Sequence, residues 1–257
     1  GGLCPGLNAV IRELVMMLHM YGVDRIFGIP NGFKGMLDSG KWKELSPEVV
    51  HEIHDQGGSI LASDVADSNV GDDQILNLKR MGVKQLFVIG GQITQTGAQR
   101  INVVLQENAW ECSVVAIPKS IENSVPMVER TFGFDTACTE AERAIDAAYL
   151  EAMSNVDTIG LVKLMGHYCG FITQNAVLAA RNVDIVLLPE MNIDIQKVVD
   201  HCLQLTQTKG YAVVVVAEGC KLAGCDGDVG PYLRSKIKAR YDEVELPMSV
   251  KYIDPTY

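Results

Sequence analysis

A short polar loop behind an apolar run carries the side chains best suited to acid–base and phosphate chemistry. Lys119 and Glu122 stand in the segment 116–126, after the β-branched run 113–117, which predicts a buried strand that Pro118 ends. Open α/β sheets bind ligands at the carboxyl ends of their strands, where this loop would lie. Lysine supplies a positive point charge, and glutamate can accept a proton. By itself, however, the segment favours an ordinary connecting loop with solvated charges.

The chain opens with a second feature that could bind an anion. A glycine turn over residues 1–6 precedes apolar residues that recur at helical spacing from Leu7 to Leu18. Glycines before a helix let backbone N–H groups approach a phosphate, and the helix dipole favours the negative charge. Taken alone, a plain turn is the better interpretation of these glycines.

Strand-like and helical runs alternate along the whole chain. This alternation predicts right-handed βαβ units with mostly parallel sheets, and therefore an α/β fold. Besides 113–117, strands are predicted over residues 25–29, 59–63, 85–89, 158–165, 184–188 and 212–216. Besides the first helix, helices are predicted over residues 75–81, 139–152 and 198–205.

The composition limits the class of protein. The chain has 257 residues, of which 47% are hydrophobic and 21% charged, as is typical of a folded protein. The formal net charge of −10 argues against a nucleic-acid surface, because phosphate contact needs clustered Lys and Arg. No apolar run approaches the roughly 20 residues of a transmembrane helix. Seven scattered cysteines predict reduced thiols in an intracellular compartment, with cytoplasm, plastid and mitochondrion left open.

The polar loop has a counterpart in a known family. Residues 118–124, Pro-Lys-Ser-Ile-Glu-Asn-Ser, resemble the Pro-Lys-Thr-Ile-Asp-Asn-Asp signature of the phosphofructokinase family. The resemblance runs from residues 1–8 through 160–166 to 252–257. Within the family, the chain most resembles the plant and protist ATP-dependent branch. It implies a phosphofructokinase-like fold of two adjoining three-layer α/β/α domains. Residues 1–136 would form the nucleotide-binding type, lacking its first strand, and residues 137–257 the sugar-phosphate-binding type, lacking its C-terminal part.

The same resemblance implies roles for individual residues. Glu122 stands at the position of the catalytic base, and Lys119 and His167 complete the implied catalytic group. The implied sugar-phosphate ligands are Ser120, Asn123, Arg130, Met165, Gly166 and Glu218. The implied nucleotide contacts are Gly1, Gly2, Phe33, Lys34, Gly90, Gly91 and Thr94. The loops at Gly90, Pro118 and Gly166 are expected to converge on one cleft.

The chain departs from the family pattern where a magnesium ion would bind. The family sequence Gly-Gly-Asp-Gly-Thr is here Gly90-Gly91-Gln92-Ile93-Thr94. Gln92 keeps an oxygen but loses the negative charge that a hard divalent cation favours. Ile93 places a β-branched side chain where backbone would approach phosphate. No metal site is predicted, and ATP with Mg²⁺ is expected only if the chain is an active kinase.

Further departures remove charges that would act on a transferring phosphate. Asp64 and His167 stand where the family carries arginines, and Ser124 replaces the second loop aspartate. Glu122 is one methylene longer than the aspartate that it replaces. The sequence therefore predicts a catalytically impaired subunit with a structural or regulatory role in a homo- or hetero-oligomer. A pocket for a ligand like fructose 6-phosphate would remain. The alternative is an active ATP-dependent 6-phosphofructokinase of glycolysis.

Overall fold

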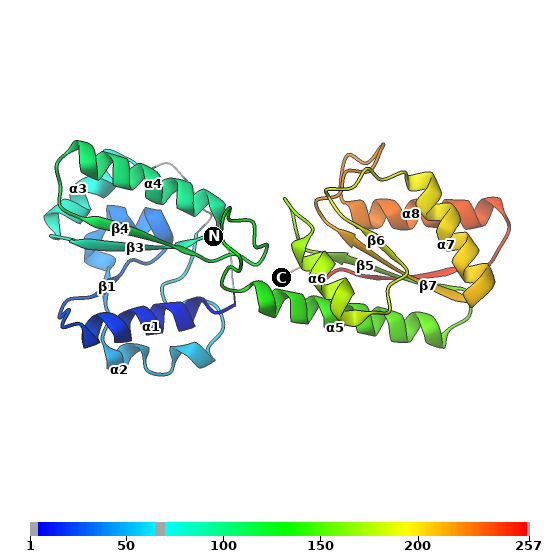
Figure 1. The fold of residues 1–257 in the computed structure, drawn as a ribbon, viewed down its shortest axis with the longest axis horizontal. Coiled ribbons are helices and arrows are strands. Elements are labelled where there is room, and N and C mark those ends of the chain that lie inside the picture. Colours follow the sequence, from blue (N-terminus) through cyan, green and yellow to red (C-terminus); the bar gives the residue numbers. More distant parts are fainter. Residues whose placement is uncertain (1–4, 65–69, 256–257) are drawn as a thin grey trace. The chain divides into compact units, whose positions relative to one another are not determined.

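The protein is described by a computed structural model over residues 5–64 and 70–255. The chain divides into two compact units, Gly1–Gly133 and Phe134–Tyr257 (Figure 1). The nucleotide-type role predicted for residues 1–136 and the sugar-phosphate-type role predicted for residues 137–257 stay predictions.

The first unit is built on two parallel strands. β3 (Gln85–Gly90) pairs with β4 (Ser113–Pro118), and Gly90 lies opposite Pro118 at their carboxyl ends. A separate antiparallel pair joins β1 (Phe27–Gly28) to β2 (Lys43–Glu44). The helices are α1 (Leu7–Met20), α2 (Pro47–Val50), α3 (Asp72–Arg80) and α4 (Gln92–Glu107), with 3-10 helices at Gly32–Leu37, Ser39–Lys41 and Ile53–Asp55. Figure 1 shows α1 and α2 on one side of β3 and β4, and α3 and α4 on the other.

The two faces of β3 contribute to two apolar clusters, because side chains alternate along a strand. Leu86 and Val88 are buried in a cluster that contains Ile101 of α4. Ile89 packs against the cluster that contains Ile11 of α1. The strand is therefore fixed between α1 and α4, which determines where its carboxyl end presents the Gly90 turn.

The second unit is a four-stranded parallel sheet in the order β6-β7-β5-β8. Its strands are β5 (Thr158–Leu164), β6 (Ile185–Leu187), β7 (Tyr211–Ala217) and β8 (Ser249–Ile253). Its helices are α5 (Phe134–Ser154), α6 (Phe171–Ala180), α7 (Ile195–Lys209) and α8 (Val229–Glu243). Helices α5 and α6 cover one face of this sheet and α7 and α8 the other (Figure 1). The three-layer α/β/α architecture and the parallel sheets are confirmed.

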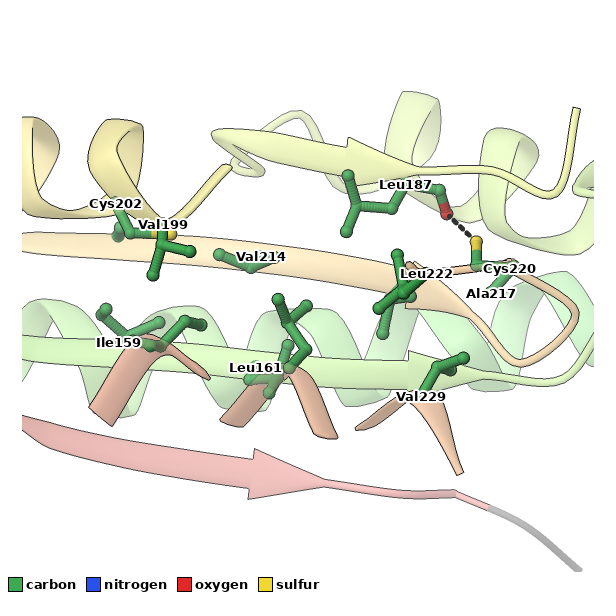
Figure 2. Packing of buried hydrophobic residues seen from close by; sticks show 14 of the residues in the cluster. Ile159, Leu161, Leu187, Val199, Cys202, Val214, Ala217, Cys220, Leu222 and Val229 are labelled. Carbon is green, nitrogen blue, oxygen red and sulfur yellow. Dashed lines mark hydrogen bonds between the residues drawn. The ribbon is translucent and has the colours of Figure 1, made fainter. Parts of the chain in front are cut away.

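The core of the second unit lies between β5, β7 and the helices α7 and α8. Figure 2 shows Val199 and Cys202 of α7 beside Val214 of β7, with Ile159 of β5 below them. Burial raises the pKa of the Cys202 thiol to about 12, so this thiol stays protonated and behaves as a small apolar side chain. Cys220 donates its S–H to the backbone oxygen of Leu187 at 3.3 Å (Figure 2). Such dense packing holds the carboxyl ends of β5 and β7 in fixed register.

Most of the predicted elements are present, but several predictions were wrong. Residues 59–63 form a turn instead of a strand, with the Ala62 N–H donating to the Ser59 oxygen at 3.1 Å. The left-handed φ of Ala62, 55°, is incompatible with a strand. The strand expected at 25–29 shrinks to β1. β4 exists but is only partly buried, since Val115 is 43% exposed. The sequence predicted neither the helices α2, α4 and α8 nor the strands β2 and β8.

The helices of the described residues were also tested for membrane-spanning character. None of those in the ranges 5–64 and 70–255 combines the length and the apolar composition that crossing a membrane requires.

Candidate functional site

The loop that carries Lys119 lies beside the Gly90 turn. The Lys119 N–H donates to the Gly90 oxygen at 3.1 Å, directly beyond the paired ends of β3 and β4. The Lys119 residue is only 6% exposed. The structure thus brings together the loop predicted for catalysis and the turn predicted for the nucleotide, both within the first unit.

Two polar side chains predicted to bind substrate hold the Lys119 loop in shape. The Ser120 hydroxyl accepts a hydrogen bond from the Glu122 N–H at 3.2 Å. The Asn123 amide spans the loop: its Oδ1 accepts from the Thr131 N–H at 2.8 Å, and its Nδ2 donates to the Glu129 oxygen at 2.8 Å. Asn123 also takes a left-handed φ of 55°, which asparagine tolerates better than most residues. A role for Ser120 and Asn123 toward a substrate stays a prediction.

Replacing Asn123 should therefore loosen this loop. Asn123→Ala removes two hydrogen bonds and is expected to cost about 1–2 kcal/mol of unfolding free energy. The loop should also be cut faster by protease near Met127, which is fully exposed. Urea denaturation and limited proteolysis measure the two effects, with Ser124→Ala as the matched control in the same loop. An unchanged cleavage rate would show that the Asn123 amide does not hold the loop.

The Gly90 turn passes directly into α4, and its glycine is required by packing. A side chain on Gly90 would collide with Thr94, which is 8% exposed. Gln95 fixes both strand ends, because its Nε2 donates to the Gly90 oxygen at 2.8 Å and to the Ile117 oxygen at 3.1 Å. The sequence prediction missed Gln95. The available signal was an amide side chain in the first turn of a helix that follows paired strand ends.

The donors in this turn do not fit a magnesium ion. Gln92 is the first residue of α4 and is exposed, and it offers one neutral amide oxygen. Magnesium sites in proteins use carboxylates together with water and substrate phosphates. Within residues 5–64 and 70–255 no group of three or more His, Cys, Asp or Glu could hold a metal ion. Ile93 is 48% exposed at the next position, so an apolar side chain faces solvent there.

A cavity of about 690 Å³ runs along β3 inside the first unit. Most of its wall is apolar and comes from α1, β1 and β3. The lining also includes Phe33 and the polar residues Lys34, Asp64, Thr94 and Lys119, of which Thr94 and Lys119 lie just beyond the paired carboxyl ends of β3 and β4. Lys34 forms an ion pair with Asp64 there. The predicted nucleotide contacts Phe33, Lys34 and Thr94 thus share one cavity wall with Lys119.

The second unit holds the other predicted residues at the carboxyl ends of two adjacent strands. β5 and β7 pair so that Leu164 lies opposite Ala217, and the chain continues into Gly166 and Glu218. The Glu218 carboxylate accepts the Gly166 N–H at 3.0 Å. Gly166 has a φ of 136°, which only glycine adopts readily. The structure brings Met165, Gly166 and Glu218 together, with the Glu218 carboxylate holding the turn.

A second carboxylate holds the far end of the same turn. Glu190 accepts the Gly170 N–H at 2.9 Å, immediately before α6 begins. His167 and Tyr168 lie between the two anchored glycines and are exposed, with ring centroids 5.2 Å apart in an edge-to-face arrangement. Glu190 was not among the predicted site residues. It follows a predicted strand, which is the position where a sequence could have singled it out.

The remaining predicted residues are not brought into one group. Arg130 is exposed on the Lys119 loop in the first unit. Gly1 and Gly2 lie outside the described residues. The Gly90 and Pro118 loops belong to the first unit and the Gly166 loop to the second. Their convergence on a single cleft stays a prediction.

The sequence prediction also missed a buried cation below the Gly166 turn. Lys163 lies in β5, its side chain is 7% exposed, and its Nζ lies 2.7 Å from both Asp228 and Asp254. A lysine inside a fully buried strand is a recognisable signal, since buried lysines require partners. Sequence spacing could not identify those partners, which lie far along the chain before α8 and after β8.

Comparison with solved structures gives the fold. A pyrophosphate-dependent phosphofructokinase from Marinobacter aquaeolei superposes with a TM-score of 0.84 at 19% identity, over 100% of this chain and 66% of that one. The phosphofructokinase from Saccharomyces cerevisiae gives a TM-score of 0.83 at 22% identity, over 100% of this chain and 37% of that one.

Comparison of sequences gives the family. ATP-dependent 6-phosphofructokinase 5, chloroplastic, of Arabidopsis thaliana is 42% identical over 100% of this chain and 51% of its own length. ATP-dependent 6-phosphofructokinase 7 of the same plant is 40% identical over 100% of this chain and 57% of its own length. The chain thus spans about half the length of these curated relatives. The family model described as "Phosphofructokinase" matches residues 1–252, and the chain belongs to the phosphofructokinase family.

Proposed function

We propose that this chain is a catalytically impaired phosphofructokinase-family subunit with a structural or regulatory role in a protein assembly. The observation that carries the proposal is the Gly90 turn, where α4 begins with Gln92 and Ile93 beside the Lys119 loop. An amide and an apolar side chain stand where the family resemblance implies a magnesium-binding aspartate and a glycine that lets phosphate approach the backbone.

The loss of charge explains why transfer would be slow. Phosphoryl transfer depends on positioning and on neutralising the charge of the transferring group, and an arginine that contacts this group can be worth roughly 10³–10⁵ in rate. Here an anion, Asp64, replaces one such arginine and His167 replaces another. Glu122 offers a base, but a misplacement of about 1 Å can cost roughly 10²-fold. A base also leaves the developing phosphate charge unneutralised.

A sugar-phosphate pocket would survive these losses. The residues proposed for it are polar or backbone groups: Ser120, Asn123, Arg130, Met165, Gly166 and Glu218. Glu218 and Gly166 are already held against each other, and this supports a preformed turn in the second unit. The proposed ligand has the chemistry of fructose 6-phosphate. In this proposal the pocket binds the ligand but does not phosphorylate it.

The second candidate is an active ATP-dependent 6-phosphofructokinase. It is favoured by relatives of that name at 38–42% identity across this chain. In this case Glu122 would serve as the base, and ATP and Mg²⁺ would be the cofactors despite Gln92. The two candidates share one fold and one set of residues, so only an activity measurement separates them.

A coupled steady-state assay tests the proposal. Full-length protein with fructose 6-phosphate is expected to turn over no faster than the blank, with either ATP–Mg²⁺ or pyrophosphate–Mg²⁺. The same assay with Glu122→Gln gives the matched control. Robust turnover by the unmodified protein that Glu122→Gln abolishes would overturn the proposal and establish the active alternative.

The proposed role also predicts association with protein subunits, as a homo- or hetero-oligomer. A subunit that has lost turnover retains a function only through what it binds. Light scattering of full-length protein at micromolar concentration is expected to give at least twice the monomer mass. A single monomeric species at that concentration, with no co-purifying subunit, would count against the assembly role.

A further inference from the structure

One lysine in the wall of the cavity already contacts an anion. Lys34 Nζ lies 2.6 Å from Asp64 Oδ2. The Lys34 side chain is 66% exposed and the Asp64 side chain 30%, and both residues line the cavity. The ion pair therefore lies where the cavity meets solvent.

The surroundings of this pair are suited to an anion. Lys119 lines the same cavity and is 6% exposed. The hydroxyl-bearing Thr94 lies at the first turn of α4, whose N-terminus carries a positive partial charge. Two lysines and a helix N-terminus would attract phosphate, and Asp64 is the carboxylate that contacts Lys34. An incoming phosphate would have to displace this carboxylate and would also be repelled by it.

We propose that Asp64 is an internal competitor for phosphate, whose carboxylate occupies Lys34 and keeps the cavity from binding a pyrophosphate group. The proposal rests on the impaired function proposed above and names Asp64 as the residue that excludes the donor from this cavity. The shared chemistry is a pyrophosphate group, which either inorganic pyrophosphate or a nucleoside triphosphate can supply.

The ion pair can be removed without unfolding the protein. Exposed pairs of this kind contribute little to stability, and asparagine keeps the shape of the aspartate side chain. Asp64→Asn should therefore leave the thermal melting curve unchanged, and Asp64→Ser provides a second variant with the same loss of charge. The matched control is Asp38→Asn in the same unit, because Asp38 forms a comparable exposed pair with Lys41 at 3.0 Å.

Isothermal titration of the full-length protein, without magnesium, tests the proposal with inorganic pyrophosphate and with ATP as separate probes. Asp64→Asn and Asp64→Ser are expected to bind at least one probe about tenfold more tightly than the unmodified protein, and the gain should shrink in 0.5 M salt. If both probes bind more tightly, the cavity recognises the pyrophosphate group itself. If only ATP binds more tightly, the cavity recognises a nucleoside triphosphate.

The decisive variant combines Asp64→Asn with Lys34→Met and should lose the gain. Three results would overturn the proposal: no gain for either probe, an equal gain in Asp38→Asn, or a gain that survives the loss of Lys34. These binding comparisons do not depend on turnover. An active unmodified enzyme would therefore contradict the proposed function while leaving the assignment of Asp64 to be decided by the titration.

Discussion

Restoring the family residues together is expected to raise fructose 6-phosphate phosphorylation about a thousandfold or more above the unmodified protein. Gln92→Asp returns a carboxylate for Mg²⁺, and Ile93→Gly opens the backbone toward phosphate. Two arginines return positive charge to the transferring group. The full set is Asp64→Arg, Gln92→Asp, Ile93→Gly, Glu122→Asp, Ser124→Asp and His167→Arg.

Single restorations in this set should do little, because groups that act on one transition state do not contribute additively. The matched control carries the same substitutions with Glu122→Asn in place of Glu122→Asp, and it should stay at the level of the blank. The coupled assay measures all variants. A large gain from Gln92→Asp alone would show that the metal site is the only defect and that the remaining positions are compatible with turnover.

Removing the buried cation of the second unit is expected to have the largest effect on stability. Lys163→Met leaves Asp228 and Asp254 without their shared partner, and because these carboxylates are 45% and 27% exposed, we expect a cost of about 2 kcal/mol of unfolding free energy. The matched control is Lys251→Met, because Lys251 of β8 pairs with Glu151 of α5 at 2.9 Å and both side chains are more than 40% exposed. That control should cost less than about 1 kcal/mol. Equal losses in the two variants by urea denaturation would contradict the buried role of Lys163.

The pKa values in this cluster define the pH range of the effect. Burial lowers the pKa of Lys163, but hydrogen bonds to Asp228 and Asp254 outweigh it and leave the pKa raised. Burial raises the pKa of Asp228, but the Lys163 and Gly230 hydrogen bonds leave it lowered. The contribution of Asp228 to the free energy of unfolding is lost as pH falls through its lowered pKa. The contribution of Lys163 is lost as pH rises through its raised pKa. The cost of Lys163→Met should therefore be constant from about pH 5 to about pH 9.

The parallel α/β architecture was predictable because its signals are local. The runs that became β4 and β6 are apolar and β-branched, and each is followed by a helix that apolar spacing predicted, α5 and α7. The turn at 59–63 was mistaken for a strand because its composition is apolar. The turn is held by a hydrogen bond from the Asn31 N–H to the Leu61 oxygen at 2.9 Å, a contact between distant residues that local composition does not encode.

The candidate site was predictable to a lesser degree. Residues next to strand ends, such as Lys119 and Gly90, could be placed because parallel strands end at one edge of a sheet. The hydrogen bonds that the side chains of the site make could not be predicted. Asn123 spans its own loop, and Glu218 accepts the Gly166 N–H. The contact between Lys34 and Asp64 joins residues thirty positions apart, a distance that no spacing rule predicts.

A single-turnover measurement of phosphoryl transfer distinguishes an impaired subunit from an active kinase. Stoichiometric full-length protein is mixed with fructose 6-phosphate and ATP–Mg²⁺, and fructose 1,6-bisphosphate is detected by mass spectrometry over a single turnover. Glu122→Gln and the fully restored variant are measured in parallel. We expect the unmodified protein to form product no faster than Glu122→Gln, and at least about a thousandfold more slowly than the restored variant. If the unmodified protein forms product rapidly and Glu122→Gln does not, the proposed catalytic impairment is contradicted.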